Sequence, residues 1–262
     1  MFTLFRKEIF SFLNSLTGYL AIIVFLLING LFLWVFPLGF NIVDYGYASL
    51  DNLFMLAPFV FLFLIPAITM RSFADEKRSG TIEMLLTKPL TDFQIILAKY
   101  FAGVMLVIFS LLPTLIYAVS VYLLGLPKGN LDMGGMWGSY IGLLFLASAF
   151  VAIGLFVSSV TDNQIIAFIL AVVLCGFSYT GFDFIAEFSW FGKADLFILS
   201  LGIQAHYTSM SRGVIDTRDV LYFLSLIGIF ILFTKIVLES RKWEAMVSRQ
   251  RSGKSKTHGN QG

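Results

Sequence analysis

Six long apolar stretches, separated by shorter polar segments, dominate the pattern of residues along the chain. An α-helix needs about 20 mostly apolar residues to cross the hydrocarbon core of a bilayer. We therefore expect six transmembrane helices, at residues 18–36, 53–70, 94–124, 137–160, 163–182 and 220–238. Before the first, apolar residues recur at helical spacing over residues 2–16 with Arg6, Lys7 and Glu8 between them, which predicts an interfacial amphipathic helix. The alternative is that these residues form the first turns of a tilted first span.

Two further segments lie outside this pattern. Residues 183–219, before the last span, mix apolar and polar positions, which is typical of short re-entrant or interfacial helices. Residues 246–262 lose hydrophobicity and gain Lys, Arg, Ser and Gly, so we expect a basic, disordered cytoplasmic tail there. The expected architecture is an all-α integral membrane protein with a single membrane domain over residues 1–245.

The composition supports this assignment and excludes others. Hydrophobic residues make up 58% of the chain and charged residues 13%, against about 45–50% and 25% in soluble globular proteins. So little charge cannot cover the surface of a soluble protein, and a single cysteine excludes a disulfide scaffold. Most of the 18 Lys and Arg residues lie in residues 2–17, in 71–99 and from 235 onward. The positive-inside rule therefore places these segments and both termini in the cytoplasm.

The loop between the second and third expected spans is the most informative segment, with the sequence RSFADEKRSGTIEMLLTKPLTDFQIILAK over residues 71–99. Its Ile82, Leu85 and Leu86 share one face of a short helix, and Pro89 ends that helix. So short a helix is marginal alone, and its compact apolar face suits insertion into a groove on a partner protein. The alternative is a loop folded back against the protein's own helix ends.

Capping residues flank this short helix. Gly80 can end the preceding element or begin the new one, and Glu83 can reach back to free backbone N–H groups. Thr91 and Gln94 form a capping-box pattern at the start of the third span. Thr161-Asp162-Asn163-Gln164-Ile165-Ile166, before the fifth span, repeats that pattern, and shared capping physics explains the repeat better than an internal duplication.

The motifs of catalysis are absent from the sequence. There is no Gly-x-x-x-x-Gly-Lys-Ser/Thr loop, so the chain cannot bind ATP in the P-loop manner, and we expect no metal site from the widely separated His206 and His258. The spans also hold almost no ionisable groups, and we expect Lys99 and Lys235 to extend toward the membrane surface. Transport driven by protons or sodium usually needs buried carboxylates, so the energy source should lie on another polypeptide. The basic tail suits anionic membrane lipid and requires no nucleic acid.

The segment E-K-R-S-G-T-I-E-M-L-L-T-K-P-L-T, with the later L-A-K, resembles the corresponding loop of ABC type-2 transporter permeases. The shared positions are Glu76, Gly80, Thr81, Glu83, Leu85, Leu86, Pro89 and Lys99. The N-terminal amphipathic helix, the six spans and the elements before the last span match the family's layout, so the resemblance covers about residues 1–245. The Phe-rich chain, with Y-A-S-L-D-N-L-F before the second span, is most similar to the gliding-motility-associated permeases of Bacteroidetes.

This resemblance implies a membrane subunit that couples a separate ATPase to export or to gliding-motility machinery in a bacterial inner membrane. The implied coupling residues are Glu76, Gly80, Thr81, Ile82, Glu83, Leu85, Leu86 and Pro89, with a second, smaller contact at Thr161, Asp162 and Asn163. The implied partners are a P-loop ABC ATPase, which would hold ATP and Mg²⁺, and a second permease half that is either this chain again or a relative. The chain itself would be neither an enzyme nor a cofactor-binding protein. The alternatives are a non-transporting membrane scaffold or assembly factor, and a permease of the same family that exports polysaccharide, drug or lipid-linked substrate.

Overall fold

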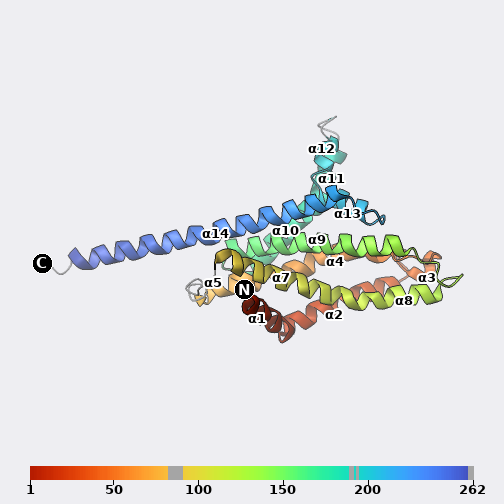
Figure 1. Cartoon of the computed structure of the whole chain (residues 1–262), viewed down its shortest axis with the longest axis horizontal. Coiled ribbons are helices and arrows are strands. Elements are labelled where there is room, and N and C mark those ends of the chain that lie inside the picture. The colour runs from red at the N-terminus through yellow and green to blue at the C-terminus, as the bar shows by residue number, and fades with distance from the viewer. Residues whose placement is uncertain (82–90, 189–191, 193–194, 259–262) are drawn as a thin grey trace.

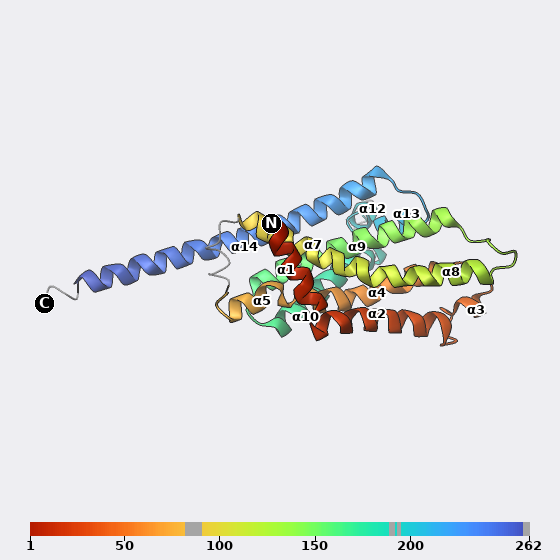
Figure 2. The same ribbon diagram turned by 60° about the horizontal axis from the view of Figure 1, so that its bottom comes forward.

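The computed structural model describes residues 1–81, 91–188, 192 and 195–258. All regular structure over these residues is helical, which confirms the predicted fold class. Long helices run side by side in a bundle (Figures 1 and 2). The N-terminus and the C-terminal part of the last helix lie at the same end of this bundle as α5 (Arg71–Arg78), and we call it the α5 end.

The observed membrane helices lie close to the predicted spans. They are α2 (Leu16–Trp34), α4 (Asp51–Thr69), α7 (Asp92–Leu111) with α8 (Leu115–Leu124), α9 (Met133–Val160), α10 (Gln164–Gly176) and α14 (Thr217–His258). Over the described residues, five helical units are long and apolar enough to cross a membrane, and there are six if α2 and the bent helix before it are counted as one span. The protein is therefore a multi-pass membrane protein, as the apolar pattern predicts.

A sharp bend separates α1 (Phe2–Leu13) from α2, with 62° between the two helix axes. The Ser15 hydroxyl caps α2 by accepting from the Gly18 N–H at 3.1 Å, and it donates to the Phe12 carbonyl at 2.8 Å. A Cβ atom on Gly18 would lie 2.9 Å from the Phe12 carbonyl carbon, so the bend needs a glycine there. The bend lays α1 across the α5 end, against α7 (Figure 2), as expected for a helix that follows the membrane surface.

The central element of the bundle is α9, which packs against α4, α7, α10 and α14. Glycines let two of these helices approach closely: a Cβ atom on Gly103 of α7 would lie 2.8 Å from the Val151 side chain of α9. Phe150 and Leu143 of α9 are fully buried. The helix is buried over most of its length because it has neighbours on several sides, and this explains its apolar sequence all around.

The prolines in the spans act in two ways. Helix α4 continues through Pro58 and Pro66 without interruption, whereas Pro113 lies in a 3-10 turn (Leu112–Thr114) that divides the third span into α7 and α8. Pro58 has no N–H to donate to the Phe54 carbonyl, and the Tyr207 hydroxyl donates to this carbonyl instead, at 2.6 Å. The missing helical bond is thus replaced by a tertiary one.

Short helices fill the segment before the last span, as the mixed pattern of residues 183–219 predicts. They are α11 (Phe182–Glu187), α12 (Asp195–Leu199) and α13 (Ile203–Met210), and a π-helical turn (Phe177–Gly181) precedes them at the end of the fifth span. Figure 1 shows α11 and α12 projecting sideways from the bundle, and α13 returns to pack on α9 and α14. His206 of α13 lies 2.7 Å from the Asp219 carboxylate of α14, and its ring stacks on Tyr222. These contacts hold α13 against the start of the last span.

The last helix differs from its prediction. We expected disorder over residues 246–262, but α14 continues to His258, and residues 259–262 lie outside the described part of the chain. Residues 241–251 are rich in Arg, Lys, Glu, Ala, Met and Gln, which are good helix formers. Because extending an existing helix costs far less than starting one, the membrane helix can propagate into a polar sequence that would not form a helix alone.

Candidate functional site

The second span extends beyond the apolar region as a polar helix, α5, at the α5 end. Residues Asp51–Arg78, which include α4 and α5, form one continuous helical unit. The first turn of α5 follows Met70, whose side chain makes no cap. The N–H groups of this turn therefore need partners from elsewhere if the segment is to remain rigid.

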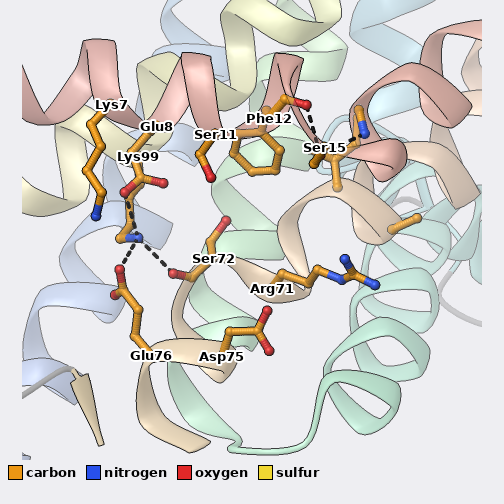
Figure 3. A pocket seen from close by; sticks show the side chains of 13 residues that line it. Lys7, Glu8, Ser11, Phe12, Ser15, Arg71, Ser72, Asp75, Glu76 and Lys99 are labelled. Atoms are coloured by element: carbon orange, nitrogen blue, oxygen red, sulfur yellow. Dashed lines mark hydrogen bonds and ion pairs between the residues drawn. The ribbon is translucent and has the colours of Figure 1, made fainter. Parts of the chain in front are cut away.

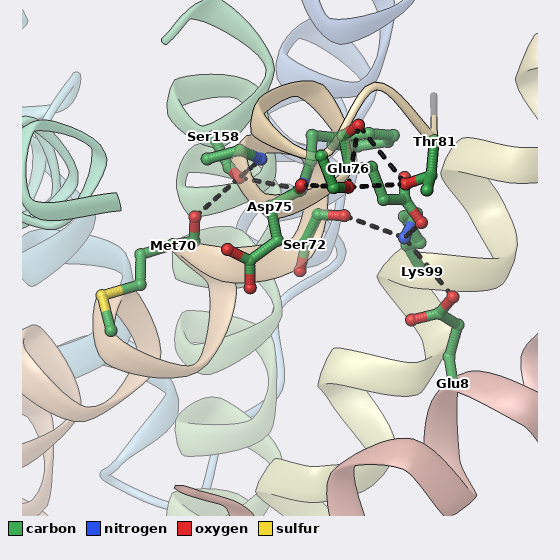
Figure 4. A network of polar contacts seen from close by, with 11 residues as sticks. Glu8, Met70, Ser72, Asp75, Glu76, Thr81, Lys99 and Ser158 are labelled. Carbon is green, nitrogen blue, oxygen red and sulfur yellow. Dashed lines mark hydrogen bonds and ion pairs between the residues drawn. The ribbon is translucent and has the colours of Figure 1, made fainter. Parts of the chain in front are cut away.

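Ser158 of α9 supplies those partners. Its hydroxyl oxygen accepts from the Phe73 N–H at 3.0 Å and from the Ala74 N–H at 3.1 Å, and the hydroxyl donates to the Met70 carbonyl at 3.0 Å (Figure 4). Ser158 is fully buried, so no water competes for these bonds. A side chain of α9 thus holds the junction between α4 and α5 in place.

Two further polar contacts bind α5 to its neighbours. The Lys77 ammonium donates to the Ser159 carbonyl at the end of α9, and the Gln164 amide donates to the Asp75 carboxylate from the first turn of α10. Together with Ser158, these contacts connect α5 to both helices on that side. The segment is therefore part of the bundle rather than a loose extension.

Lys99 of α7 is the centre of a buried polar network on the other side of α5. Its ammonium donates to the Glu76 carboxylate at 2.8 Å, to the Ser72 carbonyl at 2.8 Å and to the Glu8 carboxylate at 3.4 Å (Figure 3). The Lys99 residue is 4% exposed. Our expectation that Lys99 extends to the membrane surface is therefore wrong: its charge is compensated inside the protein.

The network joins three elements that are distant in the sequence. Glu8 lies on α1, Glu76 on α5 and Lys99 on α7, and the Phe73 ring adds a contact 5.2 Å from the Lys99 ammonium. A buried ion pair is strongly destabilised when one partner is removed, because the other is left as an uncompensated charge. The network therefore favours one relative arrangement of α1, α5 and α7.

A family model described as ABC-2 family transporter protein matches residues 40–239, which is most of the chain. This chain belongs to the ABC-2 transporter family. It is therefore a permease component of an ABC transporter, and such permeases are membrane subunits that normally work with an ABC ATPase partner. Comparison with curated proteins found no match. The matched residues of this ABC-2 permease include Glu76 and Lys99, whereas Glu8 precedes them.

The structure places three of the predicted coupling residues in or beside this network. Glu76 pairs with Lys99, and Gly80 ends α5 with a left-handed φ of +69°, which favours glycine. The Thr81 hydroxyl lies 2.8 Å from the Ser79 hydroxyl just after that turn. The remaining predicted coupling residues of the permease lie outside the described residues: Ile82, Glu83, Leu85, Leu86 and Pro89.

The second predicted contact is the turn Thr161–Asn163, which lies next to α5. Asn163 caps α10 by accepting from the Ile165 N–H at 2.9 Å, and its own N–H donates to the Thr161 hydroxyl at 3.2 Å. The capping box expected between Thr161 and Gln164 is therefore wrong, because Gln164 is used in the bond to Asp75. The turn and α5 thus belong to one surface of the permease.

At the start of α7 the predicted capping box is confirmed. The Thr91 N–H donates to the Gln94 side chain at 3.2 Å, and the Gln94 N–H donates to the Thr91 hydroxyl at 3.3 Å. This box fixes the start of the helix that carries Lys99. The segment 82–90 is therefore bounded by the glycine turn at the end of α5 and by a capped helix start.

Sequence reasoning missed the structural roles of two residues of this site, Lys99 and Ser158. A lysine within an apolar helical stretch needs a partner, and Glu8 and Glu76 were among the acids expected at the same end, so the Lys99 network left a partial signal. Ser158 left none beyond its small size, because the backbone groups that it binds are about 85 residues away. Only the packing of α9 against α4 brings them together.

Proposed function

We propose that this ABC-2 permease couples a separate, cytoplasmic ATPase to movement of its transmembrane helices through the segment that follows α5. The observation that carries the proposal is the 2.8 Å pair between Glu76 and Lys99. Glu76 lies just before that segment and Lys99 lies after it, so the pair joins its two flanking helices. A force applied to the segment would reach α4 and α7 together.

The contacts around α5 support this route. The helix is continuous with α4, and Ser158 binds it to α9, so displacing α5 along its axis would also move the second and fourth spans. Glu8 extends the network to α1 at the membrane surface. Buried, compensated charges resist separation, and the segment can therefore transmit a displacement rather than absorb it.

The finer features of the proposal follow from the sequence. The partner ATPase would hold ATP and Mg²⁺ and would contact residues 76–89, with the turn Thr161–Asn163 as a smaller second contact. A second permease half, either this chain or a relative, would complete the complex in a bacterial inner membrane. The complex would serve export or gliding-motility machinery. The rival hypothesis is a non-transporting scaffold or assembly factor, which would need no ATPase.

Native purification in mild detergent tests the proposal. We expect the tagged full chain to bring down a P-loop ATPase, identified by mass spectrometry. The double variant Glu83→Ala with Leu85→Asp should recover about tenfold less of it, because it removes an apolar anchor and introduces a charge at the expected interface. The matched control is Glu187→Ala with Leu126→Asp, since Leu126 is 92% exposed in a different loop.

The expected result is full recovery of the ATPase by the control and loss only in the first variant. Equal recovery by both variants would remove residues 82–90 from the interface. Purification of the wild-type chain without any P-loop ATPase would favour the scaffold hypothesis.

A further inference from the structure

An apolar groove runs along the outside of the bundle between α2, α4 and α10. Its volume is about 390 Å³, and apolar residues line it throughout. The floor is well buried, with Ala21, Val60, Leu64 and Ile68 each under 9% exposed, whereas Val24 at the rim is 42% exposed. The groove is therefore a preformed hollow on a surface that faces lipid, with a closed floor and an open side.

The length of the groove matches one leaflet of a bilayer. On α2 it extends from Leu20 to Ile28, and on α4 from Val60 to Ile68. Eight residues of α-helix span about 12 Å, and one leaflet contributes about 15 Å of a hydrocarbon core that is about 30 Å thick. A helix of a second subunit would cross both leaflets, so the groove fits an acyl chain better than a transmembrane helix.

At the α5 end the groove meets a polar cavity of about 260 Å³. Ala67 and Ile68 line both, so the two hollows adjoin each other. The cavity lies at the bend between α1 and α2, where Ser11 and Ser15 contribute hydroxyl groups (Figure 3). The apolar groove could hold an acyl chain, and the polar cavity beside it, at the level of the interfacial helix α1, could hold a headgroup. Together they have the shape of a phospholipid with its headgroup inside the protein.

The charges of the cavity are mixed. Lys7 and Arg71 bring positive charge to its lining, and Glu8, Asp75 and Glu76 bring negative charge, in addition to Lys99. The three cations and three anions balance, which favours a headgroup that itself carries both signs. The lysine and arginine side chains of the cavity can bind a lipid phosphate, and its carboxylates can bind a primary ammonium group.

We propose that the groove and the cavity together bind one phospholipid of the phosphatidylethanolamine type. One acyl chain lies in the groove, the phosphate lies toward Arg71 and Lys7, and the ammonium lies toward the carboxylates. Because Glu8 also pairs with Lys99, a bound lipid would stabilise α1 in its position across the bundle. The assignment is independent of the ATPase proposal, since it requires only the isolated permease and a membrane.

Photo-cross-linking in nanodiscs tests the assignment. The full chain is reconstituted with a trace of phosphatidylethanolamine that carries a diazirine on one acyl chain, and labelled peptides are mapped by mass spectrometry. We expect labelling on α2 and α4 at the groove. Phosphatidylglycerol with the same acyl chain should label the groove less, and diacylglycerol should label it about tenfold less, the factor expected for one lost charge-assisted contact.

Matched variants separate this site from general lipid contact. Val24→Trp fills the groove and should abolish its labelling, whereas Val173→Trp, on the lipid-exposed face of α10, should not. Arg71→Gln should lower labelling by phosphatidylethanolamine toward the diacylglycerol level, and Arg6→Gln, on α1 outside the cavity, should leave it unchanged. Purified amounts and thermal stability identify any variant that fails to fold.

Three outcomes would overturn the assignment. Phosphatidylglycerol labelling equal to or above that of phosphatidylethanolamine would reject the headgroup. Equal labelling by diacylglycerol would reject any headgroup recognition. A disulfide formed between two copies of a Val24→Cys variant, with no lipid labelling, would show that a second copy covers the groove. None of these results would affect the recovery of an ATPase, so the two proposals fail separately.

Discussion

Gly154 of α9 packs so closely on Thr69 of α4 that a Cβ atom at Gly154 would lie 2.9 Å from the Thr69 Cβ. That is closer than real Cβ atoms approach, and the Thr69 hydroxyl, which bonds to the Ile65 carbonyl at 2.9 Å, lies closer still. Thr69 ends α4, one turn before the backbone groups that Ser158 binds. The glycine therefore sets how close the second and fourth spans lie at the α5 end.

The first prediction concerns this contact. Gly154→Ala should lower the free energy of unfolding by about 1–3 kcal/mol, because the added methyl group forces the two helices apart. Gly228→Ala on α14 is the matched control, since a Cβ atom there meets nothing within 4 Å, and it should be neutral or slightly stabilising. Thermal unfolding of both variants in the same detergent measures the difference. Equal stability would show that α4 and α9 are not constrained at Gly154.

The second prediction concerns the buried lysine. Lys99→Met should destabilise the permease by about 3–5 kcal/mol, because it leaves the Glu8 and Glu76 carboxylates without their cation. Adding Glu76→Gln should recover part of that loss. Lys235→Met is the control, since Lys235 forms a more exposed pair with Glu239 on one helix, at 3.5 Å, and should change stability by under about 1 kcal/mol. A small effect of Lys99→Met would place the lysine in water and contradict the network.

The third prediction concerns the junction of α4 and α5. Ser158→Ala removes the acceptor of the Phe73 and Ala74 N–H groups, which should exchange hydrogen with solvent faster while the bundle stays folded. Each unsatisfied group costs about 1–3 kcal/mol. Ser110→Ala is the control, because this buried hydroxyl bonds to the Leu106 carbonyl of its own helix. Hydrogen exchange by mass spectrometry should show faster exchange in residues 71–78 for Ser158→Ala alone.

The fourth prediction concerns Tyr207. Burial raises the pKa of its phenol well above the ordinary value, so the hydroxyl stays protonated and donates to the Phe54 carbonyl. Tyr207→Phe should cost about 1–3 kcal/mol at neutral pH, because that carbonyl has no helical donor at Pro58. Tyr19→Phe, at an exposed position on α2, should cost almost nothing.

The effect of pH on that variant has a definite sign. In the unfolded chain Tyr207 ionises near pH 10, whereas in the folded chain it stays protonated at higher pH. Rising pH above 10 therefore favours the unfolded wild type and leaves Tyr207→Phe unaffected by this group, so the difference between them should shrink. A difference that grows with pH in thermal unfolding experiments would contradict a buried, neutral phenol.

Much of the fold was predictable because the responsible signals are local. The apolar stretches located the spans, and Thr91 with Gln94 predicted the start of α7, since capping depends on residues within one turn. The same local reasoning failed at Thr161, because Gln164 bonds to Asp75 on another helix. It also failed for the tail, where α14 carries helical structure from an apolar sequence into a polar one.

The candidate site was predictable only in outline. The polar loop and its resemblance indicated Glu76 and Gly80, and the structure places Glu76 in the pair with Lys99 and Gly80 in a left-handed turn at the end of α5. Their role in coupling stays a prediction. The role of Lys99 was not found, because hydropathy describes how a side chain distributes between water and lipid. It does not tell which charged groups of other helices lie beside that side chain. The role of Ser158 was not found, since its hydrogen-bond partners depend on how two helices cross.

The sequence by itself determined that this protein crosses a membrane several times and where most of its helices begin and end, because hydropathy and capping act over short distances along the chain. The tertiary structure alone decided which polar groups meet at the α5 end. Lys99 joins Glu8 and Glu76, and Ser158 binds the backbone of α5, across separations of up to 91 residues. Those pairings depend on helix packing, which close contacts such as Gly154 with Thr69 fix.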